Sequence, residues 1–228
     1  GFPWHPHRGI ETVTYLVKGD IEHADSLGNK GHILDSGCQW MTAGGGIIHQ
    51  EMPQASDRML GLQLWLNLPR KNKMVAPQYR DLTSACIPKL REPHASIAVI
   101  AGSYKGTDGA TKGDYVQTLA LDVALEPGTA WRLATDPEAT LFIYIFEGSG
   151  SFGNDVTTEE TSHRAILFGN GDEFYVKAGM KGLRFMLFAG RPLHEPIAWG
   201  GPLVMNTREE LDQAFAEIDD GTFIKRSP

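Results

Sequence analysis

Two short segments carry the side chains best able to do chemistry. His5 and His7 lie two residues apart in the first segment, and His49 and Glu51 lie two residues apart in the second. Residues two apart share a face of a β-strand, so each pair can point into the same cavity. Imidazole nitrogens and carboxylate oxygens are common metal ligands. The spacing therefore predicts one metal site made of three histidines and one carboxylate.

The composition of this ligand set favours a redox-active metal. Zinc could occupy such a set. Three histidines and one carboxylate, however, leave two positions of an octahedral ion open, and a non-haem Fe(II) centre uses open positions to bind substrate and O₂. We therefore predict Fe(II) as the metal, with Zn, Ni or Mn as substitutes, because the order of affinities alone does not select iron.

Glu11 competes with Glu51 for the role of the carboxylate ligand. It lies on the same face as His5 and His7 if their strand continues without a break. We favour Glu51, because it shares a strand with His49. We expect Glu11 to lie just outside the ligands, where such groups usually orient the ligating imidazoles.

The run from residue 61 to residue 66 alternates between leucine and other side chains. Its leucines must face a core, so Gln63 and Trp65 share the other face, toward a polar cavity or toward solvent, and the cavity is slightly favoured. Arg8 is placed outward or at the rim of the cavity, where it could hold an anionic ligand or be a solvated charge.

Other side chains have weaker assignments. Three apolar residues are candidates for the pocket wall, although ordinary core packing explains them as well: Phe2, Trp40 and Met41. Five histidines lack a partner at ligand spacing and are assigned to loops and surfaces: His23, His32, His94, His163 and His194.

Short strand-like runs separated by Gly, Pro, Asn and Asp dominate the chain and predict an antiparallel barrel or sandwich. One helix is expected near the end, where Thr207 and Glu210 form a capping-box pattern and Gly221 stops the run. The two halves look duplicated, with Ala134 and Asp136 in the positions of the first histidine pair, so the second copy has lost the metal set. A polar, proline-flanked segment at 88–94 suits the boundary between the halves.

The overall composition excludes several partners. The formal net charge is -7 and Lys and Arg form no long run, so direct binding to nucleic acid or to a membrane surface is not expected. Two cysteines cannot build a disulfide framework and fit a reducing, cytoplasmic location. We expect a monomer. Because the chain begins at Gly1, almost directly on the proposed ligands, we also expect an upstream segment that completes the first strands.

Several motifs together resemble the pirin family, whose members are two-domain proteins of the cupin superfamily. The resemblance rests on residues 5–13, 39–44, 61–65, 77–79, 195–196 and 204–207. It implies an all-β fold of two stacked antiparallel cupin barrels with a short C-terminal helix. The expected domains are a metal-binding barrel over residues 1–93 and a degenerate barrel with the helix over residues 94–228. It also implies that His5, His7, His49 and Glu51 hold the metal.

The resemblance implies two kinds of function. Several pirins are quercetin 2,3-dioxygenases, which open a flavonol ring with O₂, whereas others are metal-dependent regulators that bind transcription factors or metabolic enzymes. The acidic balance and the absence of a basic cluster favour an enzyme that acts on a small aromatic substrate, with a regulatory protein partner as the alternative. In the enzyme, Glu51 would be both a ligand and the general base for the flavonol 3-hydroxyl.

Overall fold

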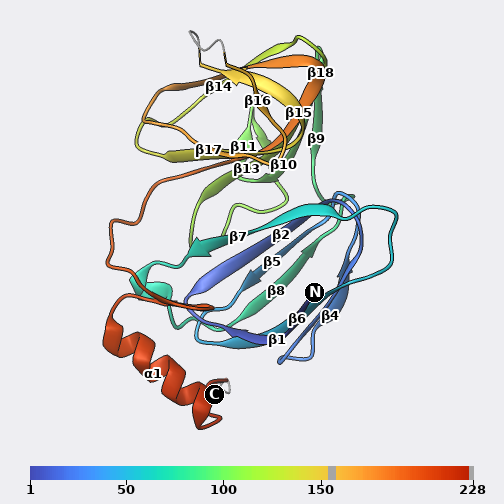
Figure 1. Ribbon diagram of the computed structural model, residues 1–228. Coiled ribbons are helices and arrows are strands. Elements are labelled where there is room, and N and C mark those ends of the chain that lie inside the picture. Colours follow the sequence, from blue (N-terminus) through green and yellow to red (C-terminus); the bar gives the residue numbers. More distant parts are fainter. Residues whose placement is uncertain (154–157, 226–228) are drawn as a thin grey trace. The chain divides into compact units, whose positions relative to one another are not determined.

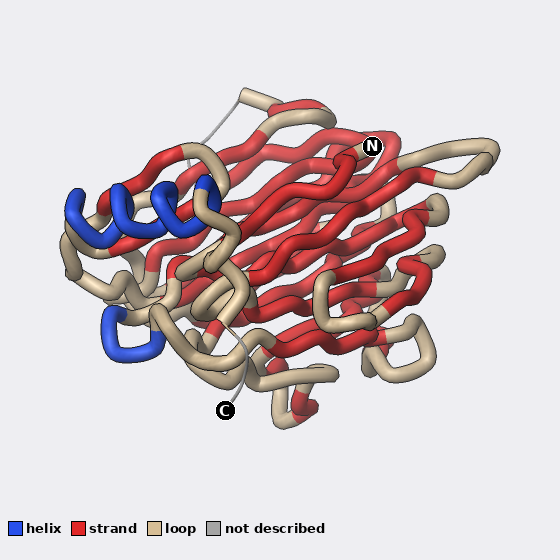
Figure 2. The backbone as a smooth tube through the Cα atoms, turned by 90° about the horizontal axis from the view of Figure 1, so that it is seen from below, coloured by secondary structure: helices blue, strands red, loops and turns tan. Residues whose placement is uncertain are grey.

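The computed structural model describes residues 1–153 and 158–225, and antiparallel strands make up most of this chain (Figure 1). Strands also dominate the backbone view of Figure 2, in which they are red. Contacts divide the chain into two compact units. Unit 1 contains Gly1–Ala85 and Leu193–Pro228, and unit 2 contains Cys86–Pro192. Within the described residues, no helix has the length and apolar character needed to cross a bilayer.

Unit 1 is built from two four-stranded sheets. In sheet order, the first contains β1 (Phe2–His7), β6 (Ile47–Pro53), β3 (Ile21–Asp25) and β4 (Lys30–Ile33). The second contains β7 (Leu60–Asn67), β2 (Ile10–Lys18), β5 (Cys38–Thr42) and β8 (Gln78–Leu82). The unit also holds the 3₁₀ helix η1 (Arg70–Asn72), the hairpin of β19 (Ala198–Gly200) and β20 (Leu203–Met205), and the helix α1 (Arg208–Asp219).

Side chains from the two sheets of unit 1 meet each other. Thr14 on β2 donates a hydrogen bond to Glu51 on β6. The ring of His7 on β1 meets Trp65 on β7 edge to face, with centroids 5.0 Å apart. Polar side chains from both sheets therefore meet between them. Unit 1 also contains a buried apolar cluster: Ile10, Met41, Ala43, Ile47 and Val204.

Unit 2 has one large sheet in the order β16-β15-β18-β13-β10-β9. The strands of this sheet are β9 (Lys89–Glu92), β10 (Ala95–Ala101), β13 (Thr118–Leu125), β14 (Ala130–Ala134), β15 (Thr140–Phe152), β16 (Glu160–Thr161), β17 (Ala165–Leu167) and β18 (Glu173–Gly190). A separate two-stranded sheet contains β11 (Ser103–Tyr104) and β12 (Thr107–Asp108). Aromatic side chains such as Trp131, Phe174 and Phe185 fill the core of unit 2. This core cluster is made of apolar and aromatic side chains.

The C-terminal helix forms as predicted. Thr207 caps α1, and its side chain and Glu210 make both hydrogen bonds of a capping box. Buried Leu211 and Ala214 pack in a cluster with Leu203, Met205 and Phe223.

The two compact units do not have the bounds of the expected domains, which were 1–93 and 94–228. The helix was assigned to the second barrel, but residues 193–225 belong with unit 1. The reason is backbone pairing with the start of the chain, because Leu203 forms a β-bridge with Arg8 and the Val204 N–H donates to the Arg8 carbonyl. Unit 2 already begins at Cys86, since β9 pairs with β10.

Candidate metal centre

Three histidines meet where β1 pairs with β6. The register places His5 opposite His49, and His7 follows two residues later on the same face of β1. One ligand nitrogen of each ring lies within 4.8 Å of the others. His7 and His49 are buried, whereas His5 is half-buried. Among the described residues, this is the one group of three or more potential ligand side chains at such distances.

Hydrogen bonds fix which nitrogen of two rings faces the centre. Nδ1 of His5 lies 2.7 Å from the carbonyl oxygen of Pro3, and Nδ1 of His7 lies 3.0 Å from that of Pro202. A carbonyl oxygen only accepts, so each Nδ1 carries the proton. In the neutral rings both Nε2 atoms are then bare lone pairs, free to bind a metal.

These two lone pairs face each other. Nε2 of His5 and Nε2 of His7 are 3.1 Å apart. Two nitrogens bound at right angles to one ion, each at about 2.1 Å, would be separated by about 3.0 Å. Two lone pairs at this distance repel each other unless a cation lies between them. Both ring nitrogens of His49 are also buried without a hydrogen-bond partner. The residues therefore fit a metal ion bound by three imidazoles.

Burial keeps two of these rings, those of His7 and His49, neutral. Burial lowers the pKa of His7 to about 4. Burial, together with the nearby rings of His7 and His5, lowers the pKa of His49 to about 2. Metal ligation requires the unprotonated imidazole, so the fold has prepared both rings for it.

Glu51 shares the inward face of β6 with His49, as predicted. It stands outside the group of atoms that lie within 4.8 Å of one another. Its carboxylate accepts a hydrogen bond from Thr14 Oγ1 at 2.9 Å. Gln63 Nε2 lies 2.9 Å from Oε1 and 2.7 Å from Oε2 of the same carboxylate. The carboxylate is thus held in a fixed orientation beside the histidines.

Gln63 and Trp65 lie on the inward face of β7, which was the favoured alternative. Gln63 reaches Glu51, and the Trp65 ring meets His7. Both side chains also reach solvent, with Trp65 37% exposed. They therefore border the open side of the centre.

Glu11 was predicted on the face of His5 and His7, and the structure contradicts this placement. The strand breaks at Gly9, whose φ is +76°, so β1 and β2 belong to different sheets. Thr14 faces the centre, and alternation then turns Glu11 to the opposite face of β2. There the Glu11 carboxylate accepts a hydrogen bond of 2.6 Å from Thr42.

The three candidates for the pocket wall have different environments. Trp40 pairs with Val13 and shares the outward face with Glu11, so it does not line the centre. Met41 lies on the inward face but packs in the buried apolar cluster with Ile10, Ala43, Ile47 and Val204. Phe2 is 63% exposed, with its ring centroid 6.3 Å from that of His5. Only Phe2 borders the histidines.

Arg8 was predicted at the rim or in solvent, and this placement is wrong. Its side chain is only 2% exposed. Nε donates to the carbonyl of Gly45, and Nη2 donates to that of Phe223 and pairs with Glu217. These three contacts hold the guanidinium against groups of the protein itself, so Arg8 is not a site for an anionic ligand.

His23 is a residue that sequence reasoning missed. It was assigned to a loop or surface, but it is fully buried on β3 opposite Glu51. Its ring centroid lies 5.3 Å from that of His49 and 4.9 Å from that of Tyr79. The two-residue spacing of His23 and Asp25 was a signal for this inward face. The other four histidines of that group are exposed, as predicted.

Comparisons with known proteins agree with this site. The family model described as Pirin matches residues 1–66, and the one described as the pirin C-terminal cupin domain matches residues 120–224. Pirin-1 of Arabidopsis thaliana is 43% identical, over 96% of this chain and 77% of the relative. A "Putative quercetin 2,3-dioxygenase" of Thermoplasma acidophilum is 38% identical, over 100% of this chain and 94% of the relative.

A solved structure extends the likeness to the fold. The crystal structure of a quercetin 2,3-dioxygenase from Acinetobacter baumannii superimposes with a TM-score of 0.88 at 36% identity, covering 96% of this chain and 78% of the other. Both halves of the chain match, and the histidines predicted as ligands converge in the matched first half. This chain is therefore a member of the pirin family, with the all-β fold of the cupin superfamily.

Proposed function

We propose that this protein is an Fe(II)-dependent dioxygenase of the quercetin 2,3-dioxygenase type, which acts on a flavonol or a similar flat aromatic substrate. The observation that carries the proposal is the pair of Nε2 lone pairs 3.1 Å apart, beside His49 and a carboxylate held on the same inward face. Three imidazoles and a carboxylate form a set that leaves open positions on an octahedral ion. Relatives whose names state this activity support the substrate class.

Each residue has a distinct role in the proposed reaction. His5, His7 and His49 hold the metal, which supplies Lewis acidity and redox chemistry when bound. Glu51 completes the ligand set and accepts the proton of the substrate hydroxyl. Thr14 and Gln63 hold the Glu51 carboxylate in place for both tasks.

The open side of the centre suits a flat substrate. Phe2 and Trp65 are both exposed aromatic side chains whose rings contact the histidines. Aromatic rings stack against or edge onto one another at centroid distances of about 4.5–7 Å. A planar flavonol entering past these residues would gain such contacts.

Oxygen uptake tests the activity. Iron-loaded protein should consume O₂ when quercetin is added, and it should not consume O₂ with a flavone that lacks the 3-hydroxyl, because Glu51 then has no proton to accept. Glu51→Ala should abolish uptake. His94→Ala is the matched control, because it removes an exposed imidazole of unit 2 and should leave the rate unchanged.

The alternative is a metal-dependent regulatory protein without catalysis. If fully iron-loaded protein shows no flavonol-dependent O₂ uptake, the dioxygenase proposal is wrong. Uptake that persists in Glu51→Ala would instead remove the proposed base from the mechanism.

A further inference from the structure

The C-terminal segment, here residues 202–225, reaches the strand end that carries His7. The carbonyl of Pro202 accepts the hydrogen bond from His7 Nδ1 at 3.0 Å. The next contact follows at once, because the Val204 N–H donates to the Arg8 carbonyl at 3.1 Å. Pro202 and Val204 of the C-terminal segment thus contact His7, a proposed metal ligand, and the adjacent Arg8.

A buried lysine reinforces this pairing. Lys73 is 2% exposed, and its Nζ donates to the carbonyls of Gly9 and Val204, each at 2.7 Å, and also to the Asn67 side chain. One ammonium group therefore ties the chain just after His7 to the C-terminal segment. Removing either carbonyl would leave a buried donor without its partner, which is costly.

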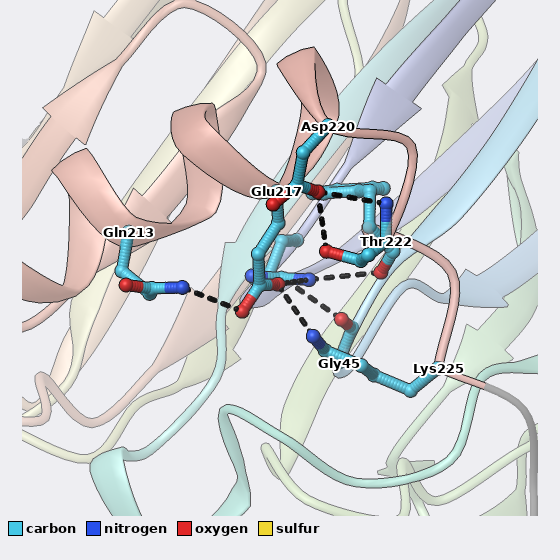
Figure 3. A network of polar contacts seen from close by, with 8 residues as sticks. Gly45, Gln213, Glu217, Asp220, Thr222 and Lys225 are labelled. Atoms are coloured by element: carbon cyan, nitrogen blue, oxygen red, sulfur yellow. Dashed lines mark hydrogen bonds and ion pairs between the residues drawn. The ribbon is translucent and has the colours of Figure 1, made fainter.

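The side chain of Arg8 fastens the far end of the same segment. Its Nη2 lies 2.7 Å from Glu217 Oε2 on α1 and 2.9 Å from the carbonyl of Phe223, and its guanidinium lies 4.3 Å from the centre of the Phe223 ring. Two further residues, Gln213 and Lys225, also contact Glu217 (Figure 3). The turn after α1 is closed by Thr222, which donates to Asp220 (Figure 3).

These contacts also bear on the orientation of the His7 ring. A metal-ligating histidine needs its second ring nitrogen held, because that bond fixes the tautomer and the ring orientation. For His7 the holding group is a backbone carbonyl of the C-terminal segment, and that carbonyl is kept in place by the pairing at Val204 and by Arg8.

We infer that residues 202–225 are a positioning element of the metal centre. Pro202 sets the tautomer of His7, and the clamp formed by Arg8 and Glu217 keeps Pro202 in contact. Metal affinity therefore depends on contacts made by a helix that holds no ligand. The inference rests on the proposed metal site but not on the dioxygenase reaction.

The test weakens the clamp and measures metal binding. Glu217→Gln removes the charge that pairs with Arg8, and Pro202→Gly loosens the backbone that presents the carbonyl. Each variant should bind Zn²⁺ or Co²⁺ about 10–100-fold more weakly in competition with a chelator, as expected when a group supporting a ligand is lost. In ¹⁵N NMR of the metal-free protein, the population of His7 with its proton on Nε2 should rise.

Asp122→Asn is the matched control. It breaks another ion pair that is largely buried, between Asp122 and Arg184 at 2.6 Å in unit 2, so it lowers stability without touching the histidines. Unfolding of all variants is measured without metal, to ensure that each is folded in the binding assay.

The outcomes distinguish failure of the proposed metal site from failure of the positioning role of residues 202–225. If natural protein binds no metal, the proposed site fails. If natural protein binds metal but both clamp variants keep its affinity and the His7 tautomer, the positioning role is wrong. An equal loss of affinity in Asp122→Asn would show that general destabilisation, and not the clamp, weakens binding.

Discussion

The indole nitrogen of Trp65 donates a hydrogen bond to the side-chain oxygen of Gln63 at 3.0 Å. Indole N–H is only a donor, so this bond fixes which end of the amide faces Trp65. The amide nitrogen must then face Glu51, where it contacts both carboxylate oxygens. An exposed tryptophan thereby controls the orientation of a buried carboxylate.

Two substitutions that remove this support should weaken metal binding to different extents. Gln63→Leu takes away the donor to Glu51, and we expect a loss of about 10–100-fold in metal affinity. Trp65→Phe keeps Gln63 but leaves its amide free to flip, so we expect a smaller loss of metal affinity than in Gln63→Leu. Chelator competition measures both. Trp131→Phe, which removes an indole of unit 2 that donates to Tyr104, should leave affinity unchanged. Equal losses in Trp65→Phe and Trp131→Phe would contradict the argument.

Metal content should approach one ion per chain. The three histidines of unit 1 form the one such cluster in the described residues, and the core of unit 2 is apolar. Elemental analysis after dialysis should give about one transition-metal ion per natural chain and almost none for His49→Ala, which lacks a buried ligand. Two tightly held ions per chain would overturn this expectation.

Gly9 should tolerate no side chain. Its φ is +76°, and an added Cβ would lie 1.9 Å from the Val204 carbonyl oxygen. Strain and overlap together should lower the free energy of unfolding of Gly9→Ala by about 2–4 kcal/mol. Gly28 has a similar φ of +90° with nothing near its Cβ position, so Gly28→Ala should cost only about 1 kcal/mol. Urea denaturation compares the two. Similar losses would mean that the contact with Val204 is unimportant.

The clamp should weaken in acid. Burial by itself raises the pKa of Glu217, but hydrogen bonds from Lys225 and Arg8 outweigh it and lower the pKa from 4.5 to about 2. The folded protein therefore binds this proton less readily than the unfolded chain, so the contribution of Glu217 to stability is complete above about pH 4.5 and is lost toward pH 2. The difference in unfolding free energy between natural protein and Glu217→Gln should shrink over that range. A difference that stays constant with pH would exclude this linkage.

Local sequence patterns predicted much of the fold and of the site. The capping box at Thr207 needs only neighbouring residues, and it is present. The two-residue spacing of His5 with His7 works because strand alternation is a local rule, and these rings do converge with His49. The alternation around Gln63 placed that residue correctly for the same reason.

Three placements were wrong, because each depends on a contact or a chain turn that the local pattern does not reveal. Arg8 resembles a surface charge in its local sequence, and its true partner Glu217 comes 209 positions later, so no local pattern reveals the pair. Glu11 was misplaced because a single residue, Gly9, turns the chain into the other sheet and resets the alternation. His23 was assigned to a loop or surface because it lacks a histidine partner at ligand spacing, but β3 lies between two strands and His23 is buried there.

The bond between His7 and Pro202 joins residues 195 positions apart. During synthesis on the ribosome, His7 emerges long before Pro202 has been made, so the ring lacks its tautomer-setting partner for most of translation. A growing chain thus offers passing ions an incomplete site. An ion bound at the proposed site is therefore expected to be selected only after Pro202 has been made, when His7 has the partner that fixes its tautomer.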